Sequence, residues 1–246
     1  MSQVKAVITD YIGTLTNARC YSMDASMVKL HRALVDSGFQ TSTEAFFAAY
    51  SEAHEKYRVI RYGECREVTN AIWVSETLRN LGFEVAAEDP RMNAALDVFF
   101  QDYIDSLELR PRADKLLKQI VGTYKLGLIS NFTYAPVVHA SLKKLGISHY
   151  FDDVTVSGDC GWRKPHLQIF ANALQRLGVK AEDAVFIGDS PLEDIKGAAA
   201  AGMKTVFVKS QFYGQDDLEA SGEKPHFIAS NLEELSQNLA RIMASK

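Results

Sequence analysis

The feature that most constrains the fold is a short apolar run near the start of the chain that ends in a carboxylate and a turn. Val4, Ala6, Val7 and Ile8 have the length and composition of a buried strand, and Gly13-Thr14 follows soon after Asp10. Ligands of parallel α/β sheets bind beyond the carboxyl ends of the strands, where Asp10 stands. These residues alone leave Asp10 as a nucleophile, a metal ligand or a cap for the turn.

Three further polar motifs each follow an apolar run. They are Ser130-Asn131, Lys164-Pro165, and Gly188-Asp189-Ser190 with Glu193-Asp194. From Pro111 onward, helical and strand-like segments alternate, a pattern that predicts a parallel, doubly wound α/β sheet. We therefore expect all four motifs to meet at one edge of one sheet.

Between Leu15 and Arg110 the periodicity is helical throughout. Helices are predicted over 26–37, from Ser42 onward, over 65–81 and over 90–107, with Gly38 and Gly82 as stops. This pattern indicates a helical bundle inserted into the sheet domain. The predicted division is a core of residues 1–15 and 110–246 and an all-helical cap of residues 16–109.

The order and spacing of the four motifs resemble the haloacid dehalogenase (HAD) superfamily, subfamily I, with its helical C1-type cap. The resemblance covers essentially the whole chain and implies a Rossmann-like core. It implies Asp10 as the nucleophile, a metal held by Asp10, Asp189 and the backbone carbonyl of Ile12, and Asp194 as a ligand or as the residue that orients a bound water. It also implies catalytic roles for Thr14, Ser130, Asn131 and Lys164.

Two of these carboxylates, Asp10 and Asp189, are expected on neighbouring strand ends. Carboxylates this close repel each other unless a cation lies between them, and oxygen ligands suit Mg²⁺. The expected cofactor is therefore Mg²⁺. Ser130 and Asn131 suit an oxyanion or phosphate, and Lys164 supplies a cation. Glu193 is expected to be a solvated acid at the start of its helix.

The first motif departs from the phosphatase form Asp-x-Asp-Gly-Thr-Leu, because Ile12 replaces the second Asp. In the phosphatases that acid protonates the leaving alcohol and later activates water. Three interpretations follow: a phosphohydrolase that works without this acid, a 2-haloacid dehalogenase-type hydrolase, or a non-catalytic binding module. We expect a Mg²⁺-dependent phosphatase that acts on a small phosphorylated metabolite through an aspartyl intermediate at Asp10.

Substrate contacts are expected from Tyr11 and from two cap arginines, Arg58 and Arg61, although a solvated basic helix face gives the same pattern. The 246 residues carry a formal net charge of −4, so charge provides no reason to expect nucleic acid or an anionic membrane as a partner. Three scattered cysteines and the lack of a long apolar run predict a cytoplasmic protein. A monomer and a homodimer remain equally compatible. The polar stretch Gln211–Lys224 is expected to be a mobile connection.

Overall fold

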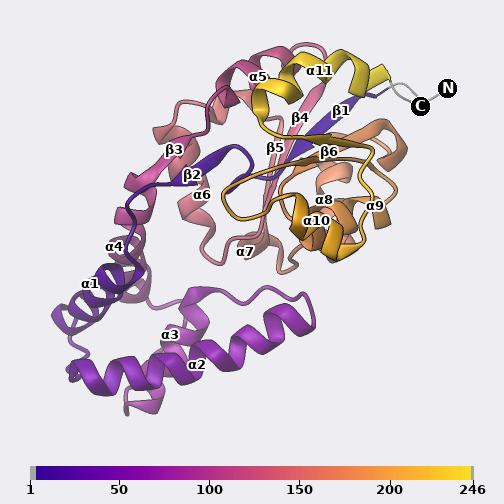
Figure 1. The fold of residues 1–246 in the computed structure, drawn as a ribbon. Helices are drawn as coiled ribbons and strands as arrows, with labels where there is room; N and C mark the ends of the chain where they lie inside the picture. The colour runs from indigo at the N-terminus through magenta and orange to yellow at the C-terminus, as the bar shows by residue number, and fades with distance from the viewer. Residues whose placement is uncertain (1–3, 245–246) are drawn as a thin grey trace.

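A six-stranded parallel sheet forms the centre of the structure, a computed structural model that describes residues 4–244 (Figure 1). The strand order is β5-β4-β1-β6-β7-β8. Their bounds are β1 Ala6–Thr9, β4 Lys125–Ser130, β5 Asp153–Val156, β6 Ala184–Gly188, β7 Lys204–Val208 and β8 Phe227–Ala229. Strand β1 pairs with β4 on one side and with β6 on the other, so the residue after β1 lies at the middle of the carboxyl edge.

Helices cover both faces of this sheet. The helices α5 (Ala113–Ile120), α6 (Ala135–Lys144) and α11 (Leu232–Ala244) share one apolar cluster with alternate strand residues such as Val7 and Val185. On the other face, α8 (Leu167–Leu177) and α9 (Lys196–Ala200) pack against Ala6, Ile8 and Phe186. The apolar strands β1 and β6 are buried on both faces, as expected of a doubly wound parallel sheet.

The segment between β1 and β4 carries a second group of helices. Helices α1 (Met23–Asp36), α2 (Thr43–Gly63), α3 (Asn70–Asn80) and α4 (Pro90–Ser106) lie apart from the sheet in Figure 1. They have their own apolar cluster, which includes Leu30, Phe46, Trp73 and Phe99 and is joined by Val137 of α6. This group is referred to below as the helical cap.

A short antiparallel ribbon joins the helical cap to the sheet. It consists of β2 (Thr16–Ala18) and β3 (Leu107–Leu109), with Thr16 opposite Leu109. The sequence analysis expected only helices here and missed both strands, because each is three residues long and has no alternating pattern. The division at residues 15–16 and 109–110 remains a prediction, and residues 1–3 and 245–246 of the predicted core lie outside the described part.

Two other expectations about local structure were wrong. The predicted connection Gln211–Lys224 contains α10 (Gln215–Ser221), which buries Leu218 and begins where the Gly214 N–H donates to Asp217 Oδ2 at 2.7 Å. The helix expected from Cys65 begins only at Asn70, because the chain at Arg66 forms an antiparallel bridge to Trp162 instead. The polar composition of residues 211–224 gave no helical signal for α10. The late start of α3 depends on a contact with a residue far away in the sequence.

The remaining elements are short. They are η1 (Ser148–Tyr150), α7 (Ser157–Cys160), η2 (Ala181–Asp183) and the π-helical turn η3 (Pro191–Ile195). Within residues 4–244, no helix combines the length and the apolar character that crossing a membrane requires.

Candidate active site

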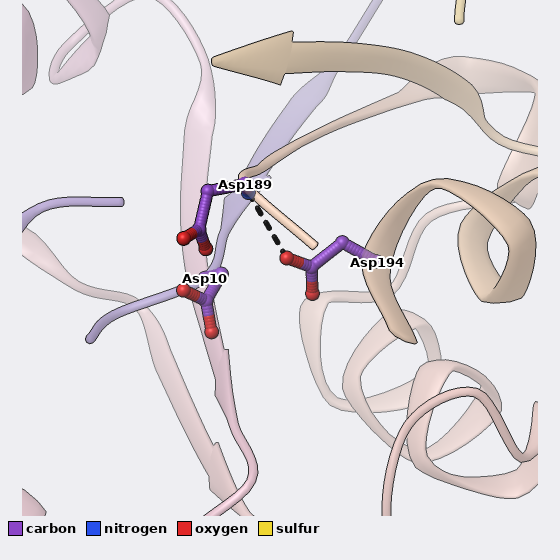
Figure 2. A group of neighbouring side chains, drawn as sticks. All are labelled: Asp10, Asp189 and Asp194. Atoms are coloured by element: carbon purple, nitrogen blue, oxygen red, sulfur yellow. Dashed lines mark hydrogen bonds between the residues drawn. The ribbon is translucent and has the colours of Figure 1, made fainter. Parts of the chain in front are cut away.

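The carboxyl edge of the sheet brings three aspartates together (Figure 2). Asp10 follows β1 and Asp189 follows β6, and these two strands are neighbours. The Asp10 N–H donates to the Ile187 carbonyl at 2.8 Å, which continues the strand pairing up to the site. Thr14 Oγ1 donates to Asp189 Oδ1 at 3.2 Å. One carboxylate oxygen from each of Asp10, Asp189 and Asp194 lies within 4.8 Å of the others.

Asp194 is held from two sides. Its Oδ2 accepts hydrogen bonds from the backbone N–H groups of Asp189 at 3.1 Å and Ser190 at 2.9 Å. Its Oδ1 lies 2.7 Å from Lys164 Nζ. A Cβ at Gly188 would lie 2.4 Å from Asp194 Oδ2, so the close approach of this carboxylate requires glycine there. Asp194 therefore fixes the loop after β6 as well as the lysine.

Lys164 lies between two of the aspartates with its side chain buried. Its Nζ donates to Asp10 Oδ1 at 2.6 Å and to the Ile129 carbonyl at 3.1 Å, in addition to the Asp194 contact. Although burial alone would lower the pKa of this ammonium, the carboxylates of Asp10 and Asp194 raise it above its usual value. Lys164 is therefore a permanent cation at the carboxyl edge.

Three carboxylates and one ammonium leave the site with excess negative charge. Burial, followed by the charges of Asp10 and Asp194, raises the pKa of Asp189 to about 8. Burial also raises the pKa of Asp194 to about 7, against the opposing effect of Lys164. These carboxyl groups would ionise at lower pH if another cation were present.

The donor set fits a hard divalent cation. Within residues 4–244, Asp10 Oδ2 and Asp189 Oδ2 are buried and have no hydrogen-bond partner. The space beside them is kept open by Gly13, where a Cβ would lie 2.4 Å from Asp189 Oδ2. Oxygen-only ligands with one or two carboxylates suit Mg²⁺. Asp10 and Asp189 are thus able to hold such an ion, whereas Asp194 Oδ2 accepts two backbone hydrogen bonds and Asp194 Oδ1 is paired with Lys164.

Asn131 anchors the backbone of Lys164. Its Oδ1 accepts from the Lys164 N–H at 2.7 Å, and its Nδ2 donates to the Lys164 carbonyl at 3.0 Å. The same Nδ2 donates to Glu193 Oε2 at 3.0 Å. Glu193 lies in the first turn of η3, as expected, but its side chain is only 30% exposed and pairs with Arg163 at 3.2 Å. Ser130, the last residue of β4, is buried beside this group.

Sequence reasoning missed Arg110, which fastens the loop after Asp10. Its Nη1 donates to the carbonyls of Gly13 at 2.5 Å and Thr14 at 3.1 Å, and its Nη2 donates to the Lys209 carbonyl at 2.6 Å. A lone arginine at the end of a helical insert carries no local signal of this role. Only the meeting of three chain segments, far apart in the sequence, reveals it.

The structure does not bring all of the predicted substrate contacts to this edge. Tyr11 is 0% exposed in the apolar core, and its hydroxyl is hydrogen bonded to Ser141 Oγ at 2.8 Å. The expectation that Tyr11 contacts substrate was therefore wrong, because the side chain after Asp10 points into the apolar core of the sheet. Arg58 forms an exposed pair with Glu55 on α2 and lines none of the described cavities near the site.

Ile12 takes the place of the missing acid as a partly buried apolar side chain packed against the core. The turn around it is closed by hydrogen bonds from Leu15 N–H to the Tyr11 carbonyl at 2.9 Å and from Gly13 N–H to the Thr16 carbonyl at 2.7 Å. The turn therefore keeps its shape without a second carboxylate.

A cavity of about 610 Å³ lies between the end of α2 and the loops that carry Lys164 and Glu193. Arg61 and Tyr62 line its cap side, and Arg163, Ser190, Lys196 and Tyr213 are among those that line it from the core. A second cavity of about 250 Å³ is lined mainly by aromatic side chains of the helical cap and by Phe132. Arg61 borders both, with its Nε donating to Glu67 Oε1 at 2.6 Å.

Comparison with known proteins agrees with this architecture. A family model described as haloacid dehalogenase-like hydrolase matches residues 4–202. A glyceraldehyde 3-phosphate phosphatase of Methanopyrus kandleri is 30% identical, over 94% of this chain and 95% of that protein. A pyrimidine 5'-nucleotidase of Escherichia coli is 28% identical over 82% of this chain and 91% of its own length.

Solved structures show the same fold. A 2-haloacid dehalogenase from Pseudomonas syringae superposes with a TM-score of 0.66 at 22% identity, covering 97% of this chain and 99% of the other. A HAD phosphatase from Thermococcus onnurineus gives a TM-score of 0.56 at 21% identity, covering 96% and 98%. The chain belongs to the haloacid dehalogenase-like hydrolase family, and the predicted membership and Rossmann-like fold are confirmed.

Proposed function

We propose that this protein is a Mg²⁺-dependent phosphatase that hydrolyses a small phosphorylated metabolite through an aspartyl-phosphate at Asp10. The observation that carries the proposal is the buried group at the carboxyl edge, in which Lys164 binds one oxygen of Asp10 while Asp10 Oδ2 and Asp189 Oδ2 have no hydrogen-bond partner among the described residues. The names of the relatives, a glyceraldehyde 3-phosphate phosphatase in M. kandleri and a pyrimidine 5'-nucleotidase in E. coli, support the substrate class.

Each residue has a physical role in this proposal. A carboxylate oxygen of Asp10 attacks phosphorus, and the alcohol oxygen leaves with the electron pair of the P–O bond. Lys164 balances the charge of Asp10, and Asn131 fixes the position of Lys164. Thr14 orients Asp189 through its hydrogen bond. Ser130 is proposed to bind a phosphate oxygen. Water then hydrolyses the acyl phosphate and regenerates the Asp10 carboxylate.

The Mg²⁺ ion is proposed to be held by Asp10, Asp189 and the Ile12 carbonyl. It would supply positive charge to the carboxylates and to the phosphoryl oxygens. We assign Asp194 to positioning, because both of its oxygens already have partners in the structure. Residues 16–109 are proposed to act as the cap that closes over the substrate. A cytoplasmic monomer or homodimer is part of the same proposal.

The test is hydrolysis of an activated aryl phosphate with and without Mg²⁺. An aryl oxide leaves without protonation, so the substrate tolerates the absence of an acid at Ile12. We expect Mg²⁺-dependent turnover by the natural protein, no turnover by Asp10→Asn, and unchanged turnover by Asp24→Asn, which alters an exposed aspartate in α1. Ile12→Asp should gain most on alkyl phosphates, by up to about 10²–10⁴-fold.

Other outcomes would contradict the proposal. A protein that is inert towards aryl phosphates with and without metal is not a phosphatase of this kind. Turnover of 2-haloacids without metal would then identify the dehalogenase-type alternative, since halide also leaves without a proton. Inertness towards both substrates would favour the binding module.

A further inference from the structure

The helical cap and the loop before Lys164 are joined by backbone hydrogen bonds. The Glu67 N–H donates to the Gly161 carbonyl at 2.9 Å, and the Arg163 N–H donates to the Cys65 carbonyl at 3.1 Å. Arg66 and Trp162 form an antiparallel bridge between these contacts. The cap loop after α2 is therefore paired directly with the segment that precedes the site lysine.

Glu67 places a buried carboxylate at this junction, with a side chain that is 0% exposed. Its Oε1 accepts from Arg61 Nε at 2.6 Å and lies 3.7 Å from Arg163 Nη1. Its Oε2 accepts from Ser157 Oγ at 2.5 Å. A carboxylate shared between a cap arginine, a core arginine and a core hydroxyl links the two parts of the molecule.

One branch of contacts leads from Glu67 to Lys164 through Arg163. The Arg163 guanidinium is 4% exposed and donates through Nη2 to Glu193 Oε1 at 3.2 Å. Glu193 Oε2 accepts from Asn131 Nδ2 at 3.0 Å. Asn131 holds both backbone groups of Lys164, and Lys164 binds Asp10.

A second branch reaches the same asparagine loop through Ser157. The Ser157 hydroxyl oxygen accepts from the Phe132 N–H at 2.9 Å, one residue after Asn131. Glu67 is thus connected to the segments on both sides of the Asn131–Lys164 contact.

We propose that Glu67 is a positioning residue by which the helical cap holds Lys164 and Asn131 in place for the reaction at Asp10. This inference rests on the proposed function. In this proposal Glu67 contacts neither substrate nor metal, and it acts by aligning Lys164 and Asn131.

The electrostatics of the junction explain why the charge of Glu67 matters. Arg163 Nη1 is buried and has no hydrogen-bond partner among the described residues, so its charge is balanced by the nearby carboxylates. Removing the negative charge would leave Arg61 without its carboxylate partner and the buried Arg163 with only Glu193. Breaking one member of a buried ion network is strongly unfavourable, and the loops would move apart to restore hydration.

The experiment compares Glu67→Gln with Glu64→Gln. The first keeps the shape of the side chain and removes its charge, while the second makes the same change at an exposed position in the same cap loop. With an aryl phosphate and saturating Mg²⁺, we expect Glu67→Gln to lower kcat roughly 10- to 100-fold with a much smaller change in KM. Glu64→Gln should match the natural protein, and Glu67→Asp, which keeps the charge, should recover part of kcat.

Amide hydrogen exchange provides a second readout that does not depend on activity. Glu67→Gln should speed exchange in the segments 129–133 and 161–165, while peptides from β6 and β7 exchange as before. Unchanged exchange in those two segments would overturn the inference, whether or not the protein proves to be a phosphatase. Equal kcat values for an active natural protein and Glu67→Gln would also overturn it, as would a loss of protection throughout the sheet.

Discussion

At the scale of single residues, the site depends on the absence of a side chain at Gly13 as well as on the aspartates themselves. Gly13 has a φ of +95°, a conformation that side chains rarely adopt, and it lies against Asp189. A side chain at this position would occupy the space next to the unpartnered oxygens of Asp10 and Asp189. The glycine of the first motif is therefore needed for both backbone shape and open space.

Replacing Gly13 with alanine, with Gly38→Ala as the control, separates the effect of backbone conformation from the effect of filling the space beside Asp189. Gly38 also has a positive φ, +102°, but a Cβ there would have no heavy atom within 4 Å. Both variants should lose roughly 1–2 kcal/mol of stability from the backbone conformation. Only Gly13→Ala should also lose activity and the rise in Tm on adding Mg²⁺. Equal Mg²⁺ responses in thermal melts of the two variants would contradict this account of the site.

At the scale of elements, the turn after β1 is attached to a helix on one face of the sheet. Tyr11 lies in the apolar cluster shared by α5, α6 and α11, and its hydroxyl bonds to Ser141 of α6. Burial raises the pKa of Tyr11 to about 12, so the phenol stays neutral. Tyr11 thus holds the turn after Asp10 against α6 and does not face the three aspartates.

Tyr11→Phe tests this assignment. Loss of one buried hydrogen bond should lower the free energy of unfolding by about 0.5–1.5 kcal/mol and leave KM unchanged, because the ring stays in the core. The control is Tyr134→Phe, which removes a more exposed bond to Asp97 and should cost less. Urea unfolding and steady-state kinetics measure the two quantities. A clear rise in KM for Tyr11→Phe alone would restore Tyr11 as a substrate contact.

At the scale of the whole molecule, folding gathers excess negative charge at one edge of the sheet. Asp189 and Asp194 have pKa values of about 8 and about 7, above the ordinary value of about 3.9. Between the ordinary Asp pKa and these raised values, the folded protein binds more protons than the unfolded chain does. The free energy of unfolding therefore falls as pH rises through this range. A bound cation would take the place of those protons.

The thermal stability of the protein should therefore depend on pH and Mg²⁺ together. Without metal, Tm should fall between about pH 4 and about pH 8, and the gain from Mg²⁺ should be larger at the higher pH. At 100 times its dissociation constant, the ion would add about 2.7 kcal/mol. Asp189→Asn should flatten the metal-free dependence and remove most of the gain. A gain from Mg²⁺ that is independent of pH would contradict this interpretation.

The sequence by itself determined the sheet, the family and the residues at its carboxyl edge. Runs such as Val4–Ile8 and Ala184–Ile187 are apolar because both faces of these strands are covered, and this signal is local. Asp10 and Asp189 each follow such a run, so their convergence follows from the geometry of parallel strands. Lys164 lies in the loop before α8 and reaches the same edge through its contacts with Asp10 and Asp194. Helical periodicity likewise identified four helices in the insert.

Only the tertiary structure decided which side chains act together and which face away. Tyr11 and Ile12 are adjacent in the sequence, yet no periodic pattern shows that Tyr11 enters the core. Arg110, Arg163 and Glu67 acquire their roles through partners that lie from thirty to about a hundred residues away, as in the contacts of Arg110 with Gly13 and of Glu67 with Ser157. Strand propensity and helical period act over a few residues, whereas the burial of a charge depends on every segment packed around it.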